Sequence, residues 1–128
     1  MRTMFVLMSH KMTQAQYDDA KNHFAIDRFV ELPNDQWSQI PADIDDISPY
    51  LADLKHNILK QFEHRDILLV QGDFGATVIM VHFAFENDMI PVYATTARIA
   101  KDIIDGDKVT TIRTFEHVRF RKYFKGCV

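Results

Sequence analysis

The segment DILLVQGDFGA (residues 66–76) predicts a buried strand, a tight turn and the start of a helix. The four consecutive aliphatic residues from Ile67 to Val70 are typical of a central parallel strand that is covered on both faces. Gly72 and Gly75 allow a tight turn and let a ligand approach the bare backbone. Because free N–H groups at a helix start attract anions, this turn is a candidate anion-binding site.

The spacing of the turn does not match two known phosphate-binding motifs. No Gly-Lys-Ser or Gly-Lys-Thr follows the strand, so the turn is not a Walker A loop. The third glycine of the dinucleotide-binding fingerprint is also missing. An ordinary strand-to-helix turn therefore remains open beside an anion site.

Composition indicates one domain spanning residues 1–128, with 47% hydrophobic residues to supply a core. The formal net charge of −3 gives no global field for nucleic acid, so we expect no DNA partner. The single cysteine, Cys127, excludes an intrachain disulfide and favours a cytoplasmic location. The apolar residues 1–8 are too short for a signal peptide or a membrane span, so no membrane partner is expected.

Predicted strands alternate with predicted helices. Apolar runs predict strands at residues 3–8, 26–32, 67–70 and 89–94. Helices are predicted at residues 13–24, 48–63 and 76–87, and residues 34–48 form a short helix and an irregular connection. The alternation predicts an α/β fold, with a parallel sheet flanked by helices and a flavodoxin-like strand order of 2-1-3-4.

The first helix begins at a capping box formed by Thr13 and Gln16. The third helix is expected to begin at Pro49, with Ser48 as its cap. Spacing in the first helix puts Ala15, Ala20 and Phe24 on the inner face, and the outer face is then Asp18, Asp19, Lys21 and Asn22.

The C-terminal part changes pattern. Asp105-Gly106 predicts a β-hairpin between residues 99–104 and 109–115, and a short helix over residues 97–104 is the alternative. The segment at 117–123 alternates strictly, which places Val118 and Phe120 on one face. His117, Arg119 and Arg121 then form the other face, either as a ligand-binding basic strip or as a solvated strand face.

Three predicted strands end in polar loops, namely 9–11, 71–74 and 95–98. In an open parallel sheet, ligands bind beyond the carboxyl ends of the strands, so these loops share one rim. Their hydroxyls, imidazole, amide, cations and aromatic ring suit a ligand that carries both phosphates and bases. No metal site is expected, because the six histidines show no paired spacing with Cys or carboxylates.

His10 is the histidine best placed for chemistry, because it directly follows a strand at this rim. A functional role and simple capping both remain open for it. His82 lies in an apolar helix and is expected to pack. A triad of Ser9, His10 and Asp73 is not expected, since adjacent Ser and His side chains point in different directions and no nucleophile elbow is present.

Several segments together resemble a small stand-alone CRISPR-associated family of type III systems. The resemblance spans essentially the whole chain and rests on FVLMSHKMT (5–13), LPNDQWSQIP (32–41), QGDFGAT (71–77), PVYATT (91–96) and HVRFR (117–121). It implies a Rossmann-like fold related to CARF domains, which sense cyclic oligoadenylates. One departure from the family pattern is Ala97, where a polar or acidic residue is expected before Arg98.

The resemblance further implies a ring nuclease that opens cyclic oligoadenylate, cyclic tetra-adenylate above all, and so switches off the antiviral signal. Proteins of the family that this chain resembles are usually homodimers, and their ligand lies across the two-fold axis of the dimer. The ribose 2′-OH is the nucleophile, so neither a metal nor a cofactor is needed, and the products end in a 2′,3′-cyclic phosphate. The enzyme must align this hydroxyl with the leaving 5′-oxygen and stabilise the phosphorane.

The implied roles fall on the rim. His10 would transfer protons, Ser9 and the Gly72 backbone would bind phosphate, and Lys11 or Arg98 would neutralise developing charge. The remaining catalytic candidate is Asp73, which would orient His10 or a ribose hydroxyl. The other ligand-binding candidates are Gln71, for an adenine edge, Phe74, for stacking, and Gly75, Thr95, Thr96, His117, Arg119 and Arg121.

Two other functions remain open at the level of sequence. One is a sensor or sponge of the same shape, which binds cyclic oligoadenylate without cleaving it. The other is a nucleotide-binding regulator unrelated to defence.

Overall fold

The computed structural model describes residues 2–126, and Cys127 lies outside them. Ten elements follow one another: β1 (Thr3–Leu7), α1 (Gln14–Phe24), β2 (Arg28–Glu31), α2 (Asn34–Ser38), the 3-10 turn η1 (Pro49–Leu51), α3 (Ala52–Leu59), β3 (Ile67–Val70), α4 (Phe74–Glu86), β4 (Ile90–Asp105) and β5 (Lys108–Lys122). The strands form one sheet in the order β2-β1-β3-β4-β5. Strands β1 to β4 run parallel to one another, and β5 runs antiparallel to β4. The chain is therefore a mixed α/β protein with the predicted strand order.

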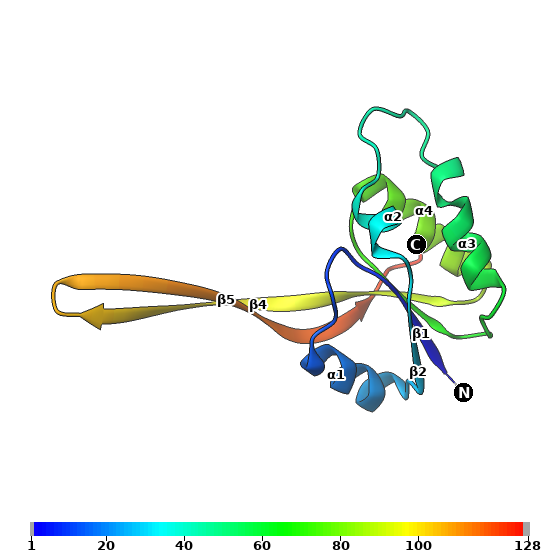
Figure 1. The fold of residues 1–128 in the computed structure, drawn as a ribbon. Coiled ribbons are helices and arrows are strands. Elements are labelled where there is room, and N and C mark those ends of the chain that lie inside the picture. The colour runs from blue at the N-terminus through cyan, green and yellow to red at the C-terminus, as the bar shows by residue number, and fades with distance from the viewer. Residues whose placement is uncertain (1, 127–128) are drawn as a thin grey trace.

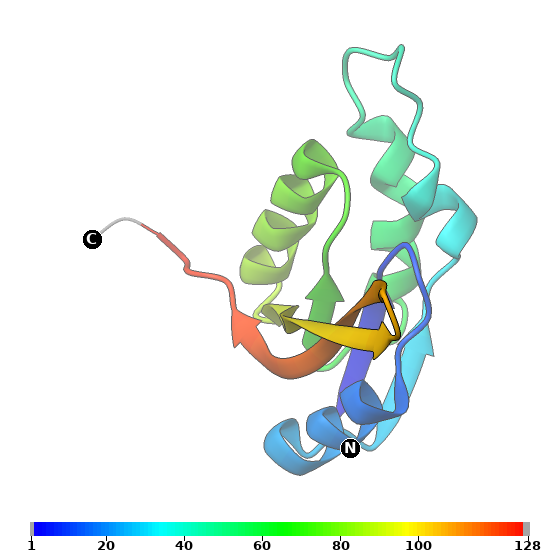
Figure 2. The same ribbon diagram turned by 90° about the vertical axis from the view of Figure 1, so that its left-hand side faces the viewer.

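Helices cover both faces of the sheet, with α1 on one side and α3 and α4 on the other (Figures 1 and 2). Alternate residues of β1 serve two separate cores, as a strand buried on both faces requires. Met4 and Val6 pack with α1, whereas Phe5 and Leu7 pack with α3 and α4. The central strand β3 is fully buried, as its aliphatic run predicts. Over residues 2–126, no helix has the length and apolar character needed to cross a membrane.

Helix starts agree with the sequence in part. The capping box of α1 is present. Thr13 Oγ1 accepts a hydrogen bond from the backbone N–H of Gln16, and Gln16 Oε1 accepts one from the backbone N–H of Thr13. The helical segment after Ser48 begins as a 3-10 turn, the Ser48 side chain makes no capping hydrogen bond to it, and α3 ends at Leu59. The predicted start at Pro49, with Ser48 in the N-cap position, is therefore confirmed, whereas a capping bond from the Ser48 side chain and an end at Glu63 are wrong.

The inner face of α1 also differs from the prediction. Ala20 is buried, but Ala15 is exposed and Gln16 is buried in its place. Asp19, predicted on the outer face, is half-buried against β5. A carboxylate can lie there because β5 supplies a hydrogen-bond donor to it.

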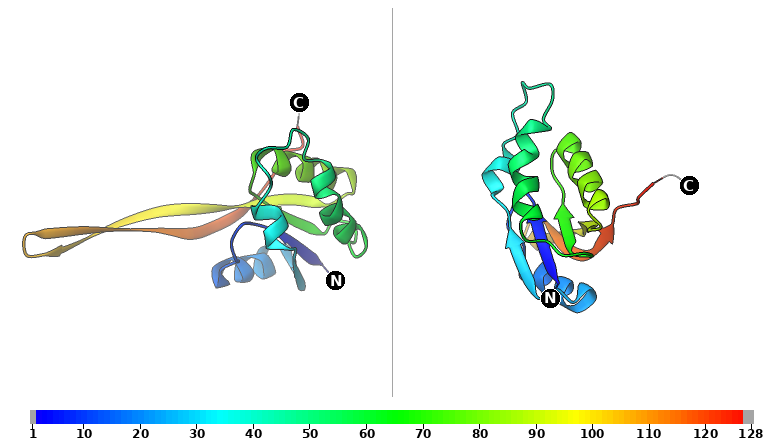
Figure 3. Two further views of the ribbon diagram at one scale, coloured as in Figure 1. Left: turned by 45° about the horizontal axis from the view of Figure 1, so that its top comes forward. Right: turned by 90° about the vertical axis from the view of Figure 1, so that its right-hand side faces the viewer.

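The long hairpin is the largest departure from the sequence prediction. β4 does not end at Ala94, and residues 95–98 continue the strand instead of forming a loop or a helix. The hairpin itself is confirmed: Asp105 pairs with Lys108, and Gly106 has φ +62°. Residues 97–116, here called the arm, project far from the body of the molecule (Figures 1 and 3), and every one of them is exposed.

A β-bulge at the base of the arm reverses the predicted alternation of β5. Thr95 pairs with Arg119 but Thr96 pairs with His117, so Val118 has no partner of its own. One extra residue turns the following side chains to the opposite face. His117 thus joins the buried Phe120, with ring centroids 4.8 Å apart, and Val118 is 56% exposed. The prediction that His117 shares a face with Arg119 and Arg121, opposite Val118, is wrong.

Gly72 is explained by packing against Trp37. The indole of Trp37 is buried and its Nε1 donates to the Gln71 carbonyl at 2.9 Å. A Cβ added at Gly72 would lie 2.5 Å from Trp37 Nε1. The direction in which a Cβ would point is therefore filled by the Trp37 ring, although Gly72 itself is exposed.

We expect Gly72→Ala to destabilise the fold by about 1–3 kcal/mol, the usual cost of overpacking. Denaturant unfolding measures this directly. The matched control is Gly75→Ala, where the nearest atoms to an added Cβ are at 3.6 Å and the residue lies in the first turn of α4. An equal loss in both variants would contradict the packing explanation.

Candidate functional site

A pocket of about 340 Å³ lies at the carboxyl ends of β1, β3 and the parallel part of β4. Its lining residues come from five parts of the chain: His10, Thr13, Gln16, Gln71, Ala94, Thr96, Phe115 and His117. Four of them, His10, Gln71, Thr96 and His117, were predicted as site residues. We call this cavity the rim pocket.

Gln71 joins the ends of two strands at the rim pocket. Its side-chain Oε1 accepts from the Ala94 amide at 2.8 Å. The side-chain oxygen of Gln71, which was expected to accept a hydrogen bond from an adenine edge, is therefore occupied by the Ala94 amide. The side-chain NH2 of Gln71 is the group that can donate to a ligand. The bond also fixes the distance between β3 and the floor of the pocket at Ala94.

His117 is held in a carboxylate pair. Its Nε2 donates to Asp19 Oδ2 at 2.7 Å, and its side chain is only 4% exposed. The other ring nitrogen, Nδ1, is buried and has no hydrogen-bond partner. With Nε2 donating to Asp19, Nδ1 is the ring nitrogen that is left without a partner, and it is enclosed by the protein.

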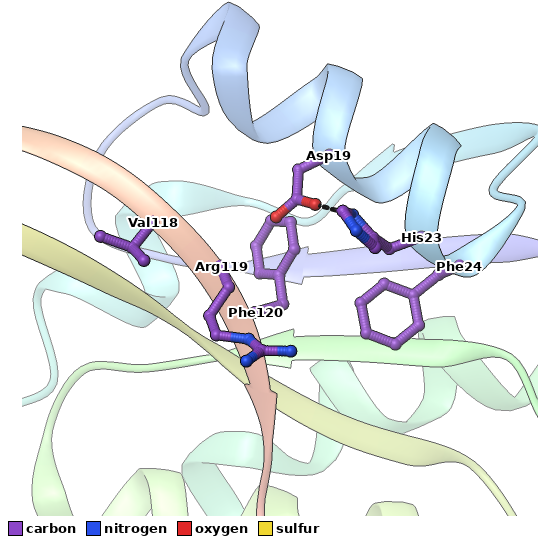
Figure 4. Close-up of a pocket in the computed structure, with 6 residues that line it drawn as sticks. All are labelled: Asp19, His23, Phe24, Val118, Arg119 and Phe120. Atoms are coloured by element: carbon purple, nitrogen blue, oxygen red, sulfur yellow. Dashed lines mark hydrogen bonds and ion pairs between the residues drawn. The ribbon is translucent and has the colours of Figure 1, made fainter.

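Asp19 also accepts a hydrogen bond from His23 Nδ1, through its second oxygen Oδ1 (Figure 4). Burial alone would raise the pKa of Asp19, but the hydrogen bonds from His117 and His23 outweigh it and hold the pKa below the usual value. Asp19 is therefore ionised at neutral pH. The two imidazoles bind different oxygens, and across residues 2–126 no group of three or more His, Cys, Asp or Glu is placed to hold a metal ion.

The pKa of Asp19 is lower in the folded state than the unfolded value, near 3.8, so the ionised carboxylate stabilises the fold. This contribution is fully present at pH values above the unfolded pKa. It is lost as the pH falls through the folded-state pKa. We expect Asp19→Asn to cost about 1–2 kcal/mol at neutral pH. The difference from the unmodified protein should shrink below about pH 3.8 in urea unfolding. The control is Asp18→Asn on the exposed side of α1. A loss that does not change with pH would contradict the pairing.

The seam between α1 and β5 holds a second pocket of about 280 Å³, drawn in Figure 4. It is lined by Asp19, His23, Phe24, Val118, Arg119 and Phe120. Arg119 and Arg121 both line an adjoining open cavity of about 510 Å³ along the same seam. These two arginines therefore lie apart from the rim pocket.

The other predicted site residues lie around the rim pocket or make structural contacts. Ser9 and Lys11 are exposed neighbours of His10, whose Nδ1 is 3.5 Å from the Lys11 carbonyl. Asp73 caps α4 by accepting from the Ala76 amide at 3.0 Å, and Phe74 is 92% exposed.

The remaining three are tied to β4 and β5. Thr95 Oγ1 donates to the Arg119 carbonyl at 2.9 Å. Arg121 donates to the Tyr93 hydroxyl at 3.0 Å. Arg98 lies 5.4 Å over the Phe115 ring, which itself lines the rim pocket. Arg98 is thus the predicted cation that contacts a wall of the pocket.

Sequence reasoning missed Asp19 and Phe115 as site residues. Asp19 and His23 are four residues apart on a helix, a spacing that brings two side chains together, and this signal was available. Nothing in the sequence indicated Phe115, because its place at the pocket depends on the pairing register of the hairpin. Thr13 and Gln16 were predicted as a capping box, and the same pair also lines the pocket.

Comparison with known proteins places the chain in a family. A family model described as the Uncharacterized protein MJ1673 family matches residues 2–121. The chain belongs to this family. A relative from Methanocaldococcus jannaschii, Uncharacterized protein MJ1673, is 49% identical over 126 residues, which is 96% of this chain and 98% of the relative. No solved structure gives a significant match. The MJ1673 family description names no activity, so function is inferred from the site.

Proposed function

We propose that the rim pocket binds a cyclic oligoadenylate, cyclic tetra-adenylate above all, and opens the ring without a metal. The observation that carries the proposal is the meeting of two imidazoles, His10 and His117, in one pocket with Gln71 and Thr96. The sequence resemblance to type III CRISPR ring nucleases supplies the ligand class. The parallel order β2-β1-β3-β4 supports a Rossmann-like, CARF-related fold, and the proposed signalling role implies a cytoplasmic location.

In the proposed reaction, the ribose 2′-OH attacks the adjacent phosphorus as its proton passes to a base. The O2′–P bond forms, the P–O5′ bond breaks, and the leaving 5′-oxygen takes a proton from an acid. The products are a 5′-hydroxyl and a 2′,3′-cyclic phosphate. Two positioned proton-transfer groups suffice for this chemistry.

His117 is the proposed base and His10 the proposed acid. The ionised Asp19 holds the His117 ring with Nε2 as the donor, which leaves Nδ1 to accept a proton. Because Nδ1 is buried, the proposal requires the pocket wall to open over this atom when the cyclic ligand binds. His10 is exposed beside the pocket and can therefore exchange protons with solvent. Ser9, Lys11 and Asp73 are retained as candidates for binding phosphate or ribose around the pocket.

Pocket size indicates how the ligand is shared. A volume of about 340 Å³ is at the small end of the range for ligand sites, roughly 300–1,000 Å³. One rim pocket is therefore proposed to hold one nucleotide of the ring and its phosphate. A two-fold ring would engage the pockets of two chains, in line with the proposed homodimer.

One observation favours the non-catalytic alternative, a sensor or sponge. The eight residues that line the rim pocket include no Lys or Arg, so no cation of the wall faces a developing phosphorane. Two cations adjoin lining residues: Arg98, through its contact with Phe115, and Lys11, which follows His10 in the chain. Binding without cleavage is then the expected behaviour if Arg98 stays on that ring.

The deciding experiment incubates excess protein with cyclic tri-, tetra- and hexa-adenylate in EDTA and separates the products by chromatography. Linear products ending in a cyclic phosphate support the ring nuclease. An intact ring that co-elutes with the protein supports the sensor. A ring that neither binds nor changes overturns both and leaves a nucleotide-binding regulator outside defence as the remaining hypothesis.

A further inference from the structure

Two glutamines of the rim pocket have their side-chain oxygens occupied by the backbone of the pocket itself. Gln16 Oε1 accepts a hydrogen bond from the backbone N–H of Thr13 at 2.9 Å, and Gln71 Oε1 accepts one from the backbone N–H of Ala94 at 2.8 Å. Because a backbone N–H can only donate, these bonds fix which end of each side-chain amide is the oxygen. The NH2 group of each glutamine is therefore the end that remains for other partners.

Both NH2 groups are free to donate to a ligand. Within residues 2–126, neither Gln16 Nε2 nor Gln71 Nε2 donates a hydrogen bond to another group, and neither is among the enclosed side-chain atoms that lack a partner. Both nitrogens therefore reach open space, although Gln16 is only 4% exposed. Since Gln16 and Gln71 line the rim pocket, their free N–H groups face this cavity.

The fold alone does not require the NH2 group of Gln16. This residue is at the N3 position of the capping box of α1, where glutamate closes the box as well as glutamine. A glutamate would also suit the positive end of the helix dipole. Glutamine at this position keeps a carboxylate out of the pocket and supplies donors in its place.

An adenine edge is a poor match for these groups. Glutamine reads adenine in a bidentate manner, with its NH2 group donating to N7 and its oxygen accepting from N6. The oxygens of Gln16 and Gln71 are both in use, so neither residue can make that pair of bonds. The oxygens of a phosphodiester only accept, and each NH2 group has two N–H donors for them.

The charges around the two NH2 groups also favour an anion. None of the eight residues that line the rim pocket is Asp or Glu, and the first turn of α1 carries no acidic residue. That turn is the positive end of the helix dipole. The carboxylate of Asp19 is bonded to His117 Nε2, and Asp19 does not line the pocket.

We propose that Gln16 and Gln71 form a phosphate subsite in the rim pocket, in which neutral amide donors bind the oxygens of a phosphodiester. The inference rests on the proposed function for the nucleotide that carries the phosphate, but not for the phosphate itself. In ring opening, the same donors would face the oxygens that gain charge in the phosphorane and act as an oxyanion hole. They would supply the stabilisation for which the pocket wall has no Lys or Arg.

The test is an NMR titration of the full chain, labelled with ¹⁵N in its glutamine side chains, with inorganic phosphate and separately with adenosine. Phosphate is expected to shift the NH2 signals of Gln16 and Gln71 together and to saturation, and to leave that of the exposed Gln61 unchanged. Adenosine should move neither signal. Equal shifts with adenosine would assign the donors to the base, and no shift with phosphate would remove the subsite, so either result overturns the proposal.

Glutamate variants remove the donors and keep the structural bonds. Gln16→Glu and Gln71→Glu each retain an oxygen for the Thr13 or Ala94 amide, so unfolding in urea should be little changed. Each should weaken phosphate binding at least about tenfold, because a bond to a charged group is lost and a like charge is added. Gln14→Glu, exposed in the same turn of α1, adds the same charge and should have a much smaller effect, since solvent screens it. Equal losses in all three variants would contradict the subsite.

Cyclic tetra-adenylate separates this inference from the proposed function. The unmodified protein is expected to bind the ring, and Gln16→Glu and Gln71→Glu to bind it at least about tenfold less tightly. Binding of phosphate without binding of the ring would overturn the proposed function and leave the subsite standing. A ring that both variants bind as tightly as the unmodified protein does would overturn the subsite and leave the proposed function standing.

Discussion

Replacing His10 with alanine is expected to slow single-turnover cleavage of cyclic tetra-adenylate by 10²–10⁴-fold, the usual contribution of a positioned proton-transfer group, and His117→Ala by a similar factor. The two losses should not add fully, because acid and base act in one step. Rapid-quench measurement with protein in excess isolates the chemical step from product release. Ring binding, measured separately, should change much less than the rate.

The pH dependence distinguishes the two roles. A base that must be neutral and an acid that must be protonated give a bell-shaped pH–rate profile. Removal of His117 should abolish the acidic limb, and removal of His10 the basic limb. Asp19→Asn should reduce the rate in the same direction as His117→Ala, because the amide no longer fixes the His117 proton on Nε2.

His82→Ala is the matched control, since His82, which the sequence predicted to pack, is instead an exposed histidine of α4 and does not line the rim pocket. Its rate and profile should equal those of the unmodified protein. If the unmodified protein cleaves the ring and both His10→Ala and His117→Ala cleave it at the same rate, the acid–base assignment is wrong. Positioning of the 2′-OH alone would then carry the catalysis.

The body of the fold was predictable because its signals are local or strongly periodic. The buried run Ile67–Val70, the capping box at Thr13 and the strand order all follow from such patterns. The arm was not predicted at its full length because neither of its faces is buried, so apolar and polar residues mix on both and the alternation assigns no inner side. Only the turn at Gly106 carried a clear signal.

The candidate site was predictable where it depends on strand ends, as for His10 and Gln71. The part of the site on β5 was not predictable, because one extra residue in that strand changes its pairing register with β4. A single bulge at Val118 turns His117 from the exposed side to the side of Asp19, and the alternating sequence gives no sign of it. The sequence predicted that three loops form the rim pocket. In the structure, the pocket is formed by the segments that follow β1 and β3 and by the paired strands β4 and β5.

Trp37→Ala is expected to cost about 3–5 kcal/mol of stability, the range for truncating a buried aromatic residue. Trp37 is 2% exposed in the core shared by α3 and α4, and the variant also leaves the Gln71 carbonyl without its indole donor. Since small domains are stable by only about 5–15 kcal/mol, this one change brings the protein close to unfolding. Denaturant unfolding gives the value.

A double-mutant cycle shows whether the indole is the reason for Gly72. Trp37→Leu keeps part of the core filled but lacks Nε1, Cε2 and Cζ2, the atoms within 3.1 Å of a Cβ at Gly72. In that background Gly72→Ala should cost almost nothing, so the coupling energy should equal its full cost in the unmodified protein. An unchanged cost would mean that the backbone, and not Trp37, requires glycine. The expected result assigns the requirement for glycine at position 72 to packing against Trp37.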